Sequence, residues 1–97
     1  MFARVTIGEG KPEQIEAGIR NFRENVVPAA KKMAGFKGSY LLVDRKSGKI
    51  LGIALWDAEE DLQASAMAAK QLSAGVTQAA AANKPPVVEI YEVAVQL

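Results

Sequence analysis

The chain contains no cysteine and no histidine among its 97 residues. The absence of cysteine excludes disulfides, thiolate metal sites and cysteine nucleophiles. The absence of histidine removes the commonest general base, the commonest metal ligand and the usual proximal ligand of haem. We therefore expect the purified protein to hold no haem, flavin, tightly bound metal or other cofactor.

Net charge and long apolar runs are also scarce. Lysine and arginine number 12 against 11 acidic residues, and the two signs are interspersed, so nothing favours binding to nucleic acid or to an anionic membrane. No apolar run is long enough for a membrane span or a signal peptide. These features predict a soluble cytoplasmic protein with one domain over residues 1–97. Such a short chain buries limited surface alone, so a partner subunit is expected.

Hydrophobic periodicity indicates two helices among four strands. Apolar residues recur at steps of three and four from Pro12 to Met33 and again after Asp57, which is typical of helices with one buried face. Pro28 lies inside the first pattern and predicts a kink or short break near residues 25–27. Gly35 suits the left-handed turn after this helix. The strands are expected at Phe2–Ile7, Phe36–Asp44, Lys49–Trp56 and Val87–Gln96.

The element order is therefore β-α-β-β-α-β, which predicts an α+β fold of the ferredoxin-like sandwich type. In that fold a four-stranded antiparallel sheet carries both helices on one face. The short loop containing Gly48 favours a hairpin between the second and third strands. Asp57 is expected to cap the second helix, with Glu60 completing a capping box.

The sheet is expected to be apolar on both faces. In the third strand Leu51, Ile53 and Leu55 alternate with Ile50, Ala54 and Trp56. In the second strand, alternation places Phe36, Tyr40 and Leu42 on one face and Leu41 and Val43 on the other. Since both helices cover one face, the other would leave a large apolar patch in water. We therefore expect a homodimer in which two sheets pack face to face.

Two local patterns resemble ligand sites but have simpler explanations. The run Gly8-Glu9-Gly10-Lys11 lacks the spacing of a phosphate-binding loop and is expected to form a turn. The acidic residues between Asp57 and Asp61 suit the start of a helix, whose N-terminus favours negative charge, and no metal site is expected there.

Six residues are candidates for binding a small molecule. Trp56 either closes a strand-to-helix corner in the core or forms a pocket wall with an indole N–H donor. Arg4 either pairs with Glu89 or Glu92 or presents a cation to a pocket. The aromatic and amide candidates could likewise face a cleft or solvent. The set is Arg4, Asn21, Asn25, Tyr40, Trp56 and Tyr91.

Residues 34–65 resemble the antibiotic biosynthesis monooxygenase (ABM) family, and the likeness extends over essentially the whole chain. It rests on Gly35-Phe36 and Gly38 after a helix, the hairpin loop Asp44-Arg-Lys-Ser-Gly-Lys49, and a strand that ends in Trp56 before acidic residues. The resemblance implies a dimeric α+β barrel. For some members it also implies cofactor-independent oxygenation of aromatic phenols to quinones, with electrons supplied by the substrate. Haem-degrading relatives use a histidine that this chain lacks.

A second hypothesis is a non-catalytic, small-ligand-binding or structural dimer of the same fold. No pair of side chains in the sequence has a spacing that demands catalysis. A closed aromatic-lined cavity would favour the oxygenase, with an aromatic small molecule as ligand. A sheet–helix interface filled by side chains would favour the structural dimer.

Overall fold

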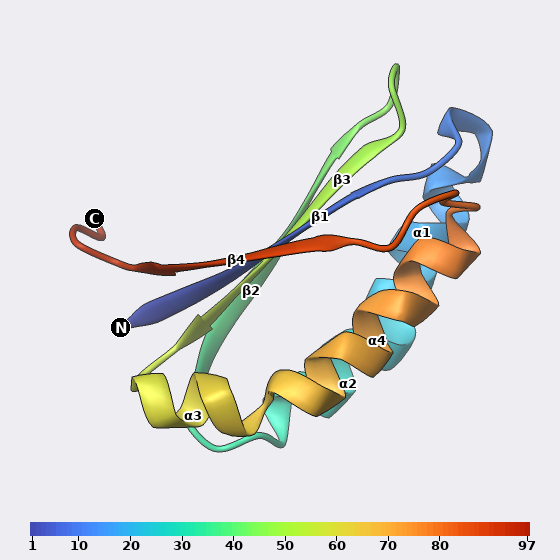
Figure 1. Ribbon diagram of the computed structural model, residues 1–97. Coiled ribbons are helices and arrows are strands. Elements are labelled where there is room, and N and C mark those ends of the chain that lie inside the picture. Colours follow the sequence, from blue (N-terminus) through green and yellow to red (C-terminus); the bar gives the residue numbers. More distant parts are fainter.

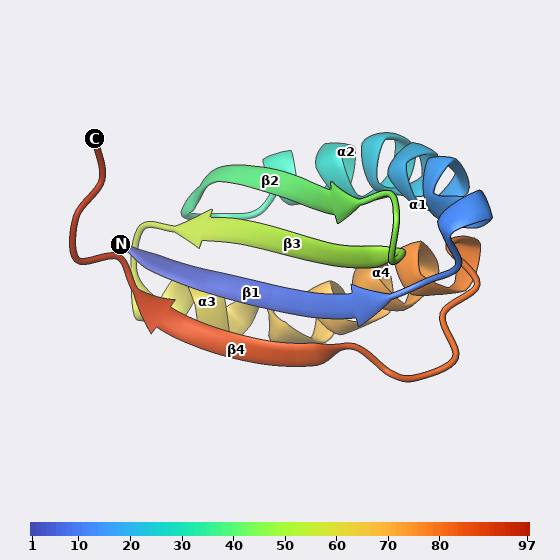
Figure 2. The same ribbon diagram turned by 90° about the horizontal axis from the view of Figure 1, so that it is seen from above.

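The computed structural model describes residues 1–97 as one sheet covered on one face by helices (Figure 1). Every neighbouring pair of strands is antiparallel, and the strand order is β2-β3-β1-β4 (Figure 2). This arrangement confirms the predicted ferredoxin-like fold. The strands are β1 (Phe2–Glu9), β2 (Phe36–Asp44), β3 (Lys49–Trp56) and β4 (Val87–Glu92). The helical segments are η1 (Pro12–Gln14), α1 (Ile15–Asn21), η2 (Phe22–Val26), α2 (Val27–Lys31), α3 (Glu59–Ala64) and α4 (Ala66–Ala79).

The first helical region is continuous but irregular ahead of Pro28. The segment η2 is a π-helix, and Pro28 lies in the first turn of α2. Proline cannot donate the backbone hydrogen bond that α-geometry requires, and a π-turn is one way to pass such a position without leaving the helix. Ala30 beyond the proline is still buried, so the apolar stripe continues to face the sheet. The stripe therefore continues past the proline as predicted, and the irregularity is a π-turn ahead of Pro28 with no break in the helix.

The second helical region begins later than predicted. Ala58, not Asp57, occupies the capping position of α3, and no side chain caps this helix. The backbone N–H of Asp57 donates to the carbonyl of Gly35 at 2.8 Å, which prolongs the extended chain beyond β3. The prediction of an Asp57–Glu60 capping box was therefore wrong. The acidic first turn of α3 remains favourable for the helix dipole.

The other departures lie at Ser65 and at the last strand. The helix is interrupted between α3 and α4 at Ser65, and Gly75 lies inside α4. The last strand ends at Glu92 and not at Gln96. Beyond it, the N–H of Val93 still donates to the carbonyl of Met1 at 2.9 Å, while the C-terminal residues lead away from the sheet (Figure 1).

A bulge in β2 changes which face one predicted residue occupies. Phe36 pairs with Trp56, but Gly38 pairs with Leu55, so the register shifts between Phe36 and Gly38. Gly38 has a φ of +150°, which L side chains rarely adopt. The shift places Phe36 on the helix-covered face, and its predicted grouping with Tyr40 was wrong.

The uncovered face of the sheet, called the open face here, is largely apolar. Strand pairing places Val5 opposite Ile53, Ile53 opposite Tyr40, and Ile7 opposite Leu51. This confirms the predicted apolar patterning on both sides of the sheet. The open face is formed by Ala3, Val5, Ile7, Tyr40, Leu42, Leu51, Ile53, Leu55, Val87, Glu89 and Tyr91.

The packed core lies near the beginning of β3. Ile15 of α1, Ile50 of β3 and Ala80 after α4 are buried together, with Ile19 and Leu41 packed against them. Trp56 lies at the other end of β3, six residues along the strand. The space between sheet and helices toward Trp56 is not completely filled by side chains.

Candidate functional site

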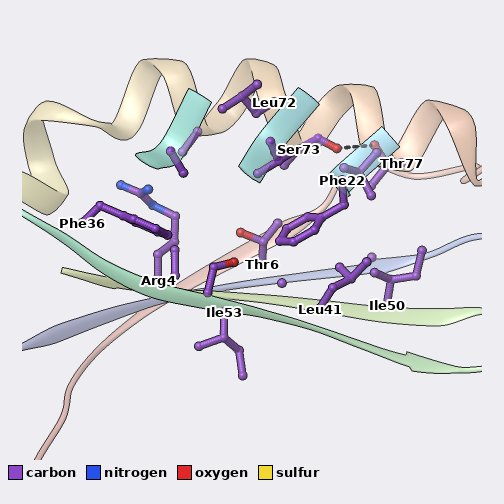
Figure 3. A pocket seen from close by; sticks show the side chains of 18 of the residues that line it. Arg4, Thr6, Phe22, Phe36, Leu41, Ile50, Ile53, Leu72, Ser73 and Thr77 are labelled. Carbon is purple, nitrogen blue, oxygen red and sulfur yellow. Dashed lines mark hydrogen bonds between the residues drawn. The ribbon is translucent and has the colours of Figure 1, made fainter. Parts of the chain in front are cut away.

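A cavity of about 90 Å³ lies between the covered face of the sheet and the helices. Apolar side chains dominate its walls, and the ring of Phe22 points into the layer between sheet and helices (Figure 3). Arg4 is the only charged residue in the lining. Lining residues from the sheet include Arg4, Thr6, Phe36, Ser39, Leu41, Ile50, Gly52, Ala54 and Trp56, and those from the helices include Phe22, Val26, Ala30, Ala69, Leu72, Ser73, Val76 and Thr77.

Trp56 is both a packing residue and an unsatisfied donor. Its side chain is 2% exposed, and its ring meets that of Phe36 edge to face at 5.6 Å between centroids. Its Nε1 is buried and has no hydrogen-bond partner. Buried polar groups are almost always paired, so an unpaired indole N–H in a cavity wall indicates a place for an acceptor atom from a bound molecule or water.

Arg4 is a buried cation without a carboxylate partner. Arg4 is 5% exposed, and its guanidinium lies 5.8 Å from the centroid of the Trp56 ring. The chain has one ion pair, between Arg45 and Glu16, so the alternative that Arg4 pairs with Glu89 or Glu92 was wrong. Burial lowers the pKa of Arg4 because removal from water disfavours its charged form.

The interruption between α3 and α4 supplies the hydrogen-bond partner of Arg4. The Nη2 of Arg4 donates to the carbonyl of Leu62 at 2.6 Å. Ser65 donates to the same oxygen from its hydroxyl at 2.7 Å and from its backbone N–H at 3.2 Å. A carbonyl at a helix end lacks its ordinary partner, and here it fixes the guanidinium beside the cavity.

Four hydroxyls that the sequence patterns did not indicate also line the cavity. Ser73 donates to the carbonyl of Lys70, and Thr77 contacts the carbonyls of Ser73 and Ala74, all at 3.1 Å. The side-chain hydroxyls of Thr6 and Ser39 make no hydrogen bond within the chain and are free to bind a ligand. Thr6 could have been found, because it lies two residues after Arg4 on the same side of β1.

The remaining predicted site residues lie outside this cavity. Tyr40 and Tyr91 are on the open face, 59% and 52% exposed, because strand alternation turns them away from the helices. Tyr91 donates to Glu89 at 2.8 Å, and this hydrogen bond, together with the carboxylate charge, raises the pKa of Tyr91. Asn25 is exposed on η2, and Asn21 lies against Gly75 between the helices. Of the six candidates, the structure brings together Trp56 and Arg4.

No group of three or more acidic, histidine or cysteine side chains is arranged to hold a metal ion. None of the helices has the length and hydrophobicity required to cross a bilayer.

Comparison with solved structures identifies the architecture. A monooxygenase of Streptomyces coelicolor, solved in complex with nanaomycin D, superposes with a TM-score of 0.77 over 99% of this chain and 89% of its own, at 14% identity. An antibiotic biosynthesis monooxygenase superposes with a TM-score of 0.71 over 98% of this chain and all of its own, at 21% identity. The chain has the ABM fold. A conserved protein of Methanosarcina mazei Go1 shares it, with a TM-score of 0.73 over 93% of this chain and 89% of its own, at 14% identity.

Sequence comparison gives relatives without a described activity. Two uncharacterised proteins of Mycobacterium tuberculosis are 37% and 38% identical over 65 residues, which is 67% of this chain. The match covers 28% and 29% of those proteins, so the chain spans less than a third of their length. No protein-family model matches the sequence.

Proposed function

We propose that the protein is a monooxygenase that acts on a hydroxylated aromatic small molecule bound beside Trp56 and Arg4. The observation that carries the proposal is the pairing of an unsatisfied indole N–H with a buried guanidinium that has no carboxylate partner, both in an apolar cavity. A phenol supplies the apolar ring and the oxygen acceptor that these groups lack. The ABM fold and the monooxygenase neighbour solved with nanaomycin D support the same reading.

Arg4 provides the chemistry for activating such a substrate. A guanidinium near a phenol favours the ionised phenolate, because opposite charges stabilise each other where water is excluded. The electron-rich phenolate then transfers electrons to O2. One oxygen atom bonds to the ring carbon opposite the hydroxyl, and the other leaves as water with the hydroxyl proton and the displaced ring hydrogen. The product is a quinone, and the substrate itself supplies the electrons.

The experiment uses 1,5-dihydroxynaphthalene as a probe, with oxygen uptake and quinone absorbance as readouts of turnover. Trp56→Phe keeps most of the ring volume but removes the indole N–H. We expect about tenfold weaker binding by calorimetry, since a hydrogen bond to a charged oxygen contributes roughly 1.5–3 kcal/mol. The thermal midpoint should move by only a few degrees. Asn25→Ala, at an exposed position on η2 outside the cavity, is the control and should change neither quantity.

Two results would count against this function. Unchanged binding by Trp56→Phe together with a large loss of stability would show that Trp56 is only a core residue. Tight binding of the probe without oxygen uptake would support the second candidate, a non-catalytic ligand-binding protein. That candidate is favoured by the cavity lining, which contains no aspartate, glutamate, histidine or lysine to transfer a proton.

We also infer that the active form is a homodimer through the open face. Its apolar residues, including the exposed Tyr40, Leu42, Val87 and Tyr91, form a patch that isolated soluble proteins rarely expose. Ile53 lies near its centre and points away from the cavity (Figure 3).

Light scattering tests this assembly. It should give twice the chain mass of 10.3 kDa. Ile53→Arg should give the monomer, while Glu24→Arg, an exposed position on η2, should leave the dimer intact. A wild-type monomer at low micromolar concentration would refute the dimer.

A further inference from the structure

The cavity beside Trp56 is too small to hold a polycyclic ligand alone. Its 90 Å³ compares with roughly 300–1,000 Å³ for ordinary small-molecule sites. A larger groove of about 630 Å³ adjoins it, between α4, the segment after α4, and β4. We call this the α4–β4 groove.

The cavity and the α4–β4 groove are lined in part by the same residues. Arg4 and Thr6 of β1, with Ala69, Ser73 and Thr77 of α4, line both. Apart from Arg4 these are small side chains, and Arg4 is held aside by the Leu62 carbonyl. A ligand with its ring in the cavity would therefore have only these side chains to pass in order to extend its remaining atoms into the groove.

The charges in the groove all have one sign. Arg4, Lys70 and Lys84 line it, and no aspartate or glutamate does. None of these three cations is in an ion pair, because the chain's one pair joins Arg45 to Glu16. Val88 and Ile90 of β4, each about half exposed, add an apolar floor. This combination fits a hydrocarbon arm that ends in an anion.

We propose that the substrate is an aromatic phenol bearing a carboxylate arm, which lies in the α4–β4 groove with its charge against Lys70 and Lys84. The proposal rests on the function proposed above and adds the chemical class of the substrate. The phenol end meets Trp56 and Arg4, and the carboxylate end meets the two lysines. Recognition at both ends would orient the ring in the cavity.

Three probes with one skeleton test the charge. They are 4-(6-hydroxynaphthalen-2-yl)butanoic acid, the corresponding primary amide, and the corresponding primary amine, each titrated into the intact protein by calorimetry. We expect the acid to bind more tightly than the amide, by roughly 3- to 10-fold for two exposed lysines, and the amine to bind most weakly. The preference should shrink when ionic strength rises from about 0.01 M to about 0.15 M, as the Debye length falls from about 30 Å to about 8 Å.

Matched variants assign the preference to the groove. Lys70→Gln with Lys84→Gln should bring the acid to the affinity of the amide and leave the amide unchanged. Lys31→Gln with Lys46→Gln removes the same charge from exposed positions outside the groove and should keep the preference.

The outcomes separate the two proposals. If all three probes bind through Trp56 with equal affinity, or if the groove variant retains the preference for the acid, the carboxylate arm is refuted and the phenol site stands. If no probe binds the wild-type protein, the phenol site fails and the carboxylate arm fails with it.

Discussion

Replacing Arg4 by methionine should weaken ligand binding while leaving the folded chain about as stable as before. The substitution removes a hydrogen bond from a charged group to the Leu62 carbonyl, which contributes roughly 1.5–3 kcal/mol. It also removes the contact with the Trp56 ring, which contributes up to about 2 kcal/mol. Against these losses stands the burial of a guanidinium that no carboxylate compensates, which costs several kcal/mol.

The net change in stability depends on whether the carbonyl oxygen of Leu62 keeps a hydrogen-bond donor. The carbonyl of Leu62 keeps the Ser65 hydroxyl at 2.7 Å, so the substitution orphans no buried oxygen. Methionine is long and unbranched and can follow the path of the arginine stem. The opposing contributions should therefore nearly cancel, and the free energy of unfolding of the variant should lie within about 1 kcal/mol of the wild-type value.

Urea denaturation and calorimetric titration check the two halves of this prediction. The free energy of unfolding comes from linear extrapolation, and affinity comes from titration with 1,5-dihydroxynaphthalene. Affinity should fall at least about tenfold, which corresponds to about 1.4 kcal/mol. Arg45→Met removes an exposed arginine and should change neither quantity by much. A loss of stability greater than about 3 kcal/mol would show that the guanidinium is a structural group and refute the reasoning.

Three further predictions concern single positions. Gly35→Ala should lower the free energy of unfolding by at least about 1–3 kcal/mol, measured with urea, because Gly35 has a φ of +78° and an added Cβ would lie 2.1 Å from Oδ2 of Asp61. Gly52→Val should abolish probe binding in calorimetry without lowering the thermal midpoint, because Gly52 lines the cavity and its Cβ direction is open. Glu89→Gln should bring the pKa of Tyr91 back toward the ordinary value of about 10 in an alkaline absorbance titration, because Glu89 favours the protonated phenol. An unchanged titration curve would show that Glu89 is not the cause.

The strands were the most predictable part of the fold because local signals define them. The bounds of β2 and β3 agree with the prediction, and Gly48 in their loop has the positive φ of +84° that a tight turn requires. The bulge at Gly38 left no trace in the alternation of apolar residues, so the face of Phe36 was predicted wrongly. The Asp57 cap failed for a nonlocal reason, since the carbonyl that holds Asp57 belongs to Gly35.

The site was only partly predictable. Trp56 and Arg4 stood out as the one tryptophan of the chain and as a charge in the middle of a strand, and both line the cavity. Tyr40 and Tyr91 could not be assigned to a face, because strands that are apolar on both sides carry no signal of which side meets the helices. Ser39 shares a face with Leu41 by simple alternation, but a single hydroxyl in a strand is no signal of a cavity, and the partner of Arg4 is a backbone carbonyl, which sequence patterns do not reveal.

The unpaired N–H of Trp56 makes the protein its own optical reporter. The chain's single indole is buried in an apolar wall with no hydrogen bond to its nitrogen, the condition under which tryptophan fluoresces at short wavelength. An acceptor that enters the cavity and bonds to that nitrogen would shift the emission to longer wavelength, and a quinone held against the ring would quench it by accepting an electron. Arrival of the phenol and formation of the quinone would then be distinguishable in real time on the unlabelled protein.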